Sequence, residues 1–170
     1  MKKELPVRKR LRLKGYDYSS AGYYFITICV ESGHEILGSV RDAHSVVPCI
    51  ELTEIGKIVI RYIENIPKHY GNVSIDKYVV MPNHIHMVVI LERGTPGCAS
   101  PTKSTLAKVI NAFKSLTSRQ FGESMWQRGY YDHIIRSETD YQRIWQYINE
   151  NPVKWVEDRY YGGILNGKPI

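Results

Sequence analysis

Two histidines, His84 and His86, stand one residue apart in the segment MPNHIHMVVI, residues 81–90. In a β-strand successive side chains point to opposite faces, so both imidazoles point the same way while Ile85 points to the other. Two imidazoles on one face can bind a single divalent ion if a third ligand comes from elsewhere in the chain. The alternative is an ordinary exposed pair at the end of a strand, and the spacing alone leaves both interpretations open.

A second pair, Tyr147 and Asn151, is four residues apart and so shares one face of the predicted last helix. Asn151 offers a neutral amide oxygen as a third metal ligand, and Tyr147 offers a phenol beside it. The alternative is a core-facing aromatic residue and a helix C-terminal asparagine ahead of Pro152. Tyr141, with isoleucines three and seven residues later, has the pattern typical of a packing tyrosine, which leaves Tyr147 on a neighbouring face.

The apolar patterns predict the elements that must position these side chains. Strands are expected at residues 22–30, 73–81, 85–91 and 132–135, with a weaker one at 36–40, and helices at 52–66, 104–120 and 137–150. We expect Pro67 to end the first helix, and Ser137 with Asp140 indicates a capping box that opens the third. With the weak strand set aside, the order β-α-β-β-α-β predicts an α+β, ferredoxin-like fold. Its antiparallel sheet has helices on one face, and a C-terminal helix carrying Tyr147 follows.

The net charge of +6 on 170 residues is concentrated at the start of the chain. Residues 1–14 hold one acid, Glu4, and seven basic side chains: Lys2, Lys3, Arg8, Lys9, Arg10, Arg12 and Lys14. They account for the whole excess, so the body at 15–170, expected to be a single domain, is neutral. A basic arm on a neutral body predicts a partner rich in phosphate, without distinguishing DNA, RNA or a membrane.

Composition excludes several classes of protein. With 43% hydrophobic and 24% charged residues, the body is globular rather than disordered. No apolar run approaches the roughly 20 residues of a membrane span, and the basic start is not followed by the apolar core of a signal peptide. Three cysteines without CxxC spacing argue against a disulfide framework or a cysteine zinc site. We therefore expect a cytoplasmic protein without a membrane partner.

Two segments are candidates for binding nucleic acid. One is the arm, through Arg8, Lys9, Arg10, Arg12 and Lys14. The other is the segment from Trp126 to Tyr131, where Trp126, Arg128 and Tyr130 combine stacking surfaces with charge, as unpaired bases require. The alternative for this second segment is a set of aromatic residues that cover the core beside a strand. For Lys108, Lys114 and Arg119 on the second helix, a solvated face is favoured over phosphate contacts, and His133 is expected to be structural.

In four places the sequence resembles the single-tyrosine HUH transposases of the smallest insertion sequences, in particular the branch associated with repetitive extragenic palindromes. The motifs, in chain order, are YYFITICV (23–30), MPNHIHMVVI (81–90), WQRGYYDHIIR (126–136), and Asp140-Tyr141 followed by YINENPV (147–153). Each motif is modest by itself, but their order and spacing together are specific. The resemblance covers most of the chain.

The resemblance implies a role for each residue of the motif. His84 and His86 become metal ligands, and Tyr147 becomes the nucleophile. Asn151 falls where the family has a polar third ligand, which is Gln in the insertion-sequence branch and Asn in the palindrome-associated one. The implied reaction is cleavage of single-stranded DNA near a hairpin with Mg²⁺ or Mn²⁺, leaving a 5′-phosphotyrosine and a free 3′-hydroxyl. The first branch acts as dimers, and the second can act as a monomer.

Physical chemistry agrees with these roles. A tyrosine hydroxyl has a pKa of about 10, so it is a poor nucleophile at neutral pH unless it is assisted. A divalent cation held by His84, His86 and Asn151 would offset charge on a phosphate and align it with the phenolate. Two other functions stay open, a domesticated protein that binds DNA hairpins without cutting and, less favoured, an RNA-binding ferredoxin-like module. The second lacks an aromatic RNP-type strand.

Overall fold

A computed structural model describes residues 16–41, 49–93, 105–158 and 160–161. The basic arm at 1–14 and its five candidate DNA-binding residues, Arg8, Lys9, Arg10, Arg12 and Lys14, lie outside the described residues. The expected boundary between arm and domain therefore stays a prediction. No helix in the described part of the chain is long and apolar enough to cross a membrane.

Four strands form the main sheet, and every neighbouring pair in it is antiparallel. They are β1 (Gly22–Cys29), β4 (Val73–Val80), β5 (His84–Leu91) and β6 (Tyr131–Ile135), in the order β4-β5-β1-β6. The helices are α1 (Glu54–His69), α2 (Leu106–Phe121) and α3 (Glu138–Glu150), with 3₁₀ turns η1 (Glu31–Gly33) and η2 (Trp155–Glu157). The predicted α+β, ferredoxin-like order is confirmed.

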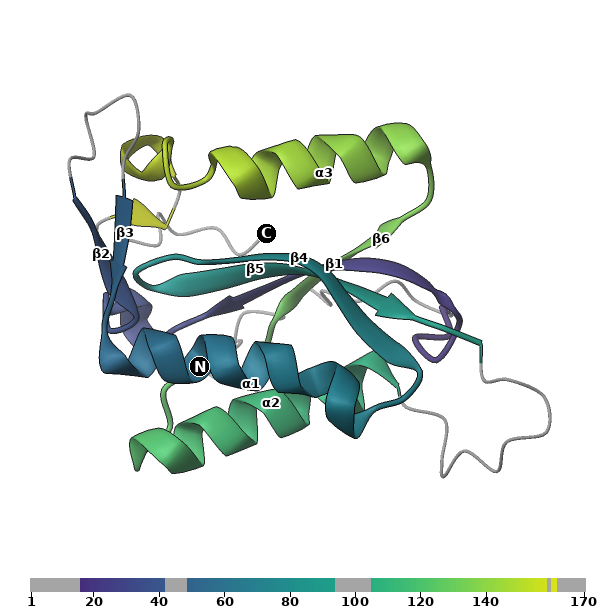
Figure 1. Ribbon diagram of the computed structural model, residues 1–170, viewed down its shortest axis with the longest axis horizontal. Coiled ribbons are helices and arrows are strands. Elements are labelled where there is room, and N and C mark those ends of the chain that lie inside the picture. The colour runs from purple at the N-terminus through teal and green to yellow at the C-terminus, as the bar shows by residue number, and fades with distance from the viewer. Residues whose placement is uncertain (1–15, 42–48, 94–104, 159, 162–170) are drawn as a thin grey trace, which may run out of the picture.

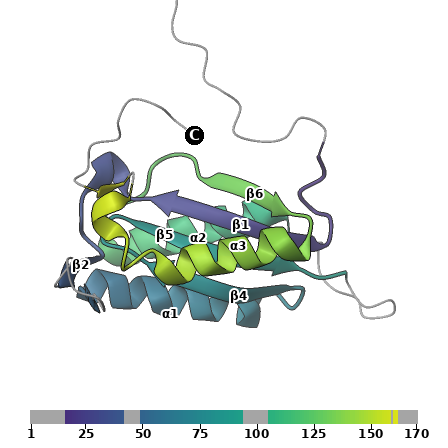
Figure 2. The same ribbon diagram turned by 90° about the horizontal axis from the view of Figure 1, so that it is seen from above.

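Helices cover both faces of this sheet. Figure 1 shows α1 and α2 side by side below the sheet and α3 above it, and Figure 2 shows α3 lying lengthwise over the strands. The lower layer contains the larger apolar core, to which β5 contributes Ile85, Met87 and Val89. The upper layer contains a smaller cluster of Phe25, Val88, Ile144 and Ile148. The alternation of β5 therefore sends its histidines toward α3.

The start of α3 follows the predicted capping box. The side-chain oxygen of Ser137 accepts a hydrogen bond of 3.2 Å from the backbone N–H of Asp140, which satisfies one of the free donors at the helix start. Tyr141 attaches the same helix to β4, since its hydroxyl donates to Asp76 over 2.7 Å. That hydrogen bond, together with partial burial, raises the pKa of Tyr141 to about 12. Tyr141 thus has the packing role predicted for it, and it also anchors α3 to β4.

One local expectation was wrong, and one strand was not predicted. Helix α1 does not stop before Pro67 but continues through it to His69. Ile63 and Ile66 are buried, and their packing holds the last turn in place although proline contributes no N–H. The weak strand expected at 36–40 is present as β2 (Gly38–Arg41), and it pairs with an unpredicted strand, β3 (Cys49–Leu52), in a separate small sheet. With only four residues each, these strands give a weak sequence pattern.

Candidate active site

His84 and His86 begin β5 on the face that α3 covers, and neither side chain is exposed. Their Nε2 atoms lie 3.0 Å apart. The exposed-pair alternative is therefore wrong, and the convergence expected from strand alternation is present. Phe25 stacks on the His86 ring at a centroid distance of 5.2 Å, which leaves that ring little freedom to turn.

Asn83 determines which nitrogen of His84 carries hydrogen. Its amide nitrogen donates to the backbone carbonyls of Gly33 and Tyr160, at 3.2 and 2.7 Å. The amide oxygen therefore faces His84 Nδ1 at 2.8 Å, and because a carbonyl oxygen can only accept, Nδ1 must donate. In the neutral imidazole, Nε2 of His84 then carries the lone pair, which is the form that binds a metal.

His86 has a comparable partner on the neighbouring strand. Thr27 Oγ1 lies 2.8 Å from His86 Nδ1, and a hydroxyl can donate or accept there. When Thr27 accepts, the Nε2 lone pairs of both histidines face each other. Two lone pairs 3.0 Å apart repel, so this arrangement needs a positive centre, which is either a proton on one nitrogen or a bound cation.

Tyr147 lies in the last turns of α3 and reaches the same point from the other side. Its hydroxyl is 3.2 Å from His86 Nε2, and its ring is edge-on to Phe25 at 6.0 Å. The side chain is 39% exposed, so the phenol has contact both with the buried histidines and with the outside. The alternative role of Tyr147, a core-facing aromatic residue, is therefore wrong, because its side chain is exposed.

Asn151 is buried, with 3% of its surface exposed, at the C-terminal end of α3. Its Nδ2 donates to Asp158 Oδ2 over 2.9 Å, while its Oδ1 is buried and has no hydrogen-bond partner. A buried polar atom without a partner is costly and calls for an explanation. Coordination of a cation by Asn151 Oδ1 would supply one, and this agrees with its expected role as the third ligand.

Asp158 is the residue that the sequence interpretation missed. His84, His86 and Asp158 each offer one possible metal-ligand atom, and these three atoms lie within 4.8 Å of one another. In the described part of the chain, no other group of three or more His, Cys, Asp or Glu residues is arranged in this way. Asp158 follows η2, in a segment without helical or strand periodicity. The available signal was weak: a carboxylate a few residues beyond the expected ligand Asn151, after an apolar Trp155 able to anchor the segment.

A groove of about 560 Å³ opens beside Tyr147 and Asn151. Phe25 and Tyr131 contribute aromatic surface to it, and His133 and Arg143 contribute nitrogen donors. The volume falls within the range of about 300–1,000 Å³ typical of ligand sites. The remaining lining residues are Ile144, Glu150, Lys154, Glu157 and Asp158.

One wall of this groove contains a charged cluster that connects β6 to α3. Asp140 Oδ2 lies 2.8 Å from His133 Nε2, and Asp140 Oδ1 accepts from Arg143 over 2.8 Å. Burial opposes ionisation of Asp140, but the hydrogen bonds from His133 and Arg143 outweigh it and lower the pKa of Asp140 below its ordinary value. This cluster gives His133 the structural role expected for it.

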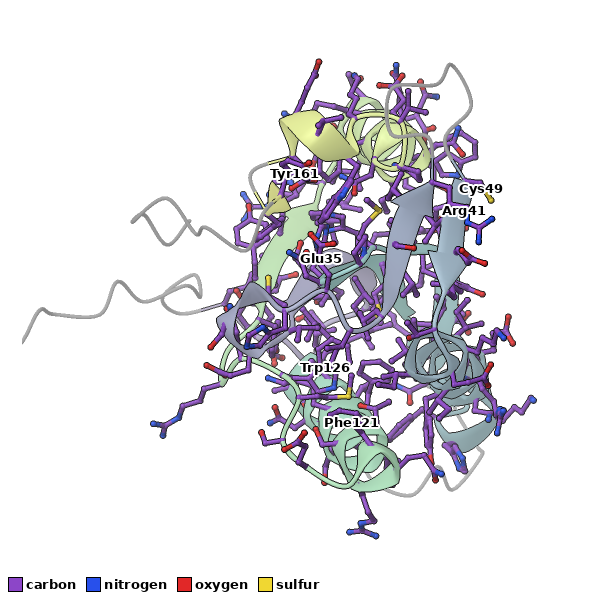
Figure 3. The ribbon with its side chains drawn as sticks, turned by 90° about the vertical axis from the view of Figure 1, so that its left-hand side faces the viewer. Glu35, Arg41, Cys49, Phe121, Trp126 and Tyr161 are labelled. Carbon is purple, nitrogen blue, oxygen red and sulfur yellow. The ribbon has the colours of Figure 1, made fainter. Side chains whose placement is uncertain are left out.

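The expected DNA-binding segment at residues 126–131 is divided by the fold. Trp126 is 4% exposed and its indole N–H donates to Thr117 over 2.8 Å, so its expected role in stacking on bases was wrong. Figure 3 shows Trp126 among the side chains between α2 and the sheet. Tyr130 packs partly buried against the larger core, whereas Arg128 is exposed.

Lys114 follows neither of the two alternatives considered for it. Its ammonium group donates to the carbonyls of Gln127, Arg128 and Gly129, at 2.5, 3.2 and 3.0 Å. Burial lowers the pKa of Lys114 below its ordinary value. The lysine thus holds the turn before β6 and lies neither on a solvated helix face nor at a phosphate.

Comparison with known proteins shows which family the chain belongs to. The model of the family "Transposase IS200 like" matches residues 49–151. An uncharacterized protein of Haemophilus influenzae is 37% identical over 172 aligned residues, which cover 91% of this chain and 93% of that protein. The REP-associated tyrosine transposase of Escherichia coli K12 is 31% identical over 86 residues, 49% of this chain and 48% of that protein.

A solved structure shares the fold. It is a REP-associated tyrosine transposase bound to a REP hairpin, with a TM-score of 0.61 and 20% identity, covering 95% of this chain and 77% of that one. Together with the Escherichia coli relative, it confirms the expected resemblance to the REP-associated transposases. The chain belongs to the IS200-like transposase family.

Proposed function

We propose that this protein is a metal-dependent endonuclease and strand transferase that acts on single-stranded DNA at hairpins, through a covalent 5′-phosphotyrosine on Tyr147. One observation carries the proposal. The exposed phenol of Tyr147 lies 3.2 Å from His86 Nε2, which in turn is 3.0 Å from the Nε2 of His84. A nucleophile beside a pair of converging imidazoles is the arrangement that metal-assisted phosphoryl transfer requires.

The residues around this point fit a divalent cation. When Thr27 accepts from His86 Nδ1, the two facing Nε2 lone pairs need a positive centre, and Asn151 Oδ1 is a buried acceptor without a hydrogen-bond donor. A cation held by His84, His86 and Asn151 would neutralise charge on the scissile phosphate beside the tyrosine. Mg²⁺ or Mn²⁺ is the proposed ion, and imidazole ligands would also retain Ni²⁺ or Zn²⁺ during purification.

The reaction follows from the chemistry of the tyrosine. The phenolic oxygen of Tyr147 attacks the phosphorus, a bond from that oxygen to phosphorus forms, and the bond from phosphorus to the 3′-oxygen breaks. The phenol loses a proton and the departing 3′-oxygen gains one, so no co-reactant is consumed. Because the phosphotyrosine conserves the ester bond, a 3′-hydroxyl can attack it and rejoin strands. One tyrosine holds one DNA end at a time, so joining two ends takes two chains or two successive reactions.

The groove beside Tyr147 is the proposed path of the unpaired strand. The half-buried ring of Tyr131 offers apolar surface against which a base can lie, and Arg143 offers charge for a phosphate. Hairpin binding is further proposed to use the arm residues Arg8, Lys9, Arg10, Arg12 and Lys14 and the exposed Arg128. These six cations would provide phosphate affinity.

A covalent-adduct assay tests the proposal. The protein is incubated with single-stranded hairpin oligonucleotides and Mn²⁺, and a protein–DNA species is sought on a denaturing gel. We expect the adduct with the natural protein and with Tyr141→Phe, and none with Tyr147→Phe or in EDTA. An adduct that persists in Tyr147→Phe would assign the wrong nucleophile. Tight hairpin binding with no adduct under Mg²⁺ or Mn²⁺ would instead support the non-cleaving alternative.

A further inference from the structure

We propose that Asp158 is a fourth protein ligand of the metal site and the one that makes the site favour hard cations such as Mg²⁺ and Mn²⁺. The inference rests on the metal site of the proposed function. It adds a residue from outside helix α3 and outside the His84–His86 strand. The resemblance to the transposase family supplied His84, His86 and Asn151 but gave no reason to consider this carboxylate.

The carboxylate is aimed at the site by two hydrogen bonds. Asp158 Oδ2 accepts from Asn151 Nδ2 over 2.9 Å, and Asp158 Oδ1 accepts from the backbone N–H of Tyr160 over 2.8 Å. A carboxylate has about four lone-pair positions, so both oxygens keep acceptor capacity after these two bonds. One carboxylate oxygen of Asp158 lies within 4.8 Å of a ring nitrogen of each histidine, close enough for all three atoms to bind one ion.

The segment that carries Asp158 is attached to the histidine strand. Asn83 Nδ2 donates to the Tyr160 carbonyl, and the Tyr160 ring lies against the His84 ring at a centroid distance of 4.5 Å. On the other side of Asp158, Trp155 is 3% exposed, with its ring 6.0 Å from that of His84. Figure 2 shows η2 folding back at the end of α3. Buried contacts on both sides thus fix Asp158 in place.

Charge explains why a carboxylate matters here. Two neutral imidazoles and one amide carry no negative charge, and such a set favours the softer ions that bind nitrogen well. Mg²⁺ and Mn²⁺ prefer oxygen ligands, carboxylates above all. Asp158 also orients Asn151. Because only the amide nitrogen can donate to a carboxylate, Oδ1 of Asn151 must be the end that has no hydrogen-bond partner.

Metal titration tests this role without any DNA. We would measure Mn²⁺ and Ni²⁺ binding by isothermal titration calorimetry for the natural protein, Asp158→Asn, and the matched control Glu157→Gln. Glu157 is an exposed acid on the same groove, one residue away, so both substitutions remove one negative charge. We expect at least a tenfold loss of Mn²⁺ affinity in Asp158→Asn, a clearly smaller loss of Ni²⁺ affinity, and less than a twofold change in the control.

Each other outcome is decisive. Mn²⁺ affinity in Asp158→Asn that matches Glu157→Gln would overturn the ligand role, while the histidine site would stand. Equal loss of both metals in Asp158→Asn would show that Asp158 only shapes the segment, which also contradicts the proposal. If the natural protein binds neither metal, or His84→Ala binds both unchanged, the metal site of the proposed function itself is wrong. Retained Ni²⁺ binding verifies that the variant is folded.

Discussion

The two faces of strand β5 differ in what their side chains do, although these side chains alternate along one segment. The face toward α1 and α2 is apolar and completely buried, with Ile85, Met87 and Val89 in the larger core. The face toward α3 is buried as well, but begins with His84 and His86, hydrogen-bonded to Asn83 and Thr27. A single strand thus contributes stability through one face and the proposed active site through the other, and neighbouring substitutions should separate the two.

The largest expected effect is on the α3 face. His86→Leu removes a proposed metal ligand but keeps a side chain of similar size, so we expect a loss of at least about 100-fold in adduct formation with the fold retained. Met87→Leu, one residue away on the other face, is the matched control and should keep its activity because the volume is conserved. Single-turnover adduct formation on a hairpin oligonucleotide measures both. Comparable activity in the two variants would contradict the division between the faces.

The next effect is on the opposite face. Met87→Ala removes a fully buried side chain and leaves a cavity, so we expect the free energy of unfolding to fall by about 2–5 kcal/mol. Molecules that remain folded should still bind Mn²⁺ with the natural affinity. Urea unfolding and metal titration in the same buffer give the two quantities. A large loss of metal affinity without a loss of stability would reverse our assignment of the faces.

A smaller effect is expected at Asn83, which contacts the site without reaching its centre. Asn83→Ala removes the acceptor that keeps the hydrogen on His84 Nδ1, together with two hydrogen bonds to Gly33 and Tyr160. Partners of metal-bound histidines typically contribute about 10–100-fold to metal affinity, and we expect a loss of that size for Mn²⁺. Calorimetric titration measures it. Asn72→Ala, at a half-buried asparagine before β4, serves as control.

The smallest effect concerns how α3 is attached. Because Asp140 has a lowered pKa in the folded protein, its contribution to stability is present above its unfolded pKa of about 4 and is lost as the pH falls through the lower folded value. We therefore expect Asp140→Asn to cost about 1–2 kcal/mol at pH 7, since its partner Arg143 is exposed, and progressively less below pH 4. Thermal unfolding at several pH values tests this, with Glu138→Gln as the first-turn control.

The fold was largely predictable because it depends on regular patterns. The alternation in residues 84–91 and the capping box at Ser137 each involve neighbours in sequence, so the strand face and the start of α3 follow directly. The helix end expected at Pro67 was wrong because the tertiary packing of Ile63 and Ile66 outweighed the rule that proline ends a helix. The role of Trp126 was wrongly predicted because an aromatic residue in a loop can either stack on a base or pack into the core, and the sequence does not distinguish the two.

The candidate site was predictable only in part, because only some of its residues lie in regular elements. His84, His86, Tyr147 and Asn151 occupy regular elements, so spacing and family resemblance could single them out. Asp158 comes after the last helix, in a segment held by Asn83, by the Trp155 ring and by Tyr160. The residues to which this segment is attached, Asn83 and His84, are far away in sequence, so no local pattern predicts these contacts.

The strand pairing of β1 also has a consequence for how the molecule folds. Thr27 pairs with His86 on one side and with Tyr131 on the other, so strands from distant parts of the chain must meet before the histidines acquire their partners. Pairing over such separations slows folding, because long loops must close first. An ion that binds the complete site would stabilise only the finished molecule, and the melting temperature should rise with its concentration.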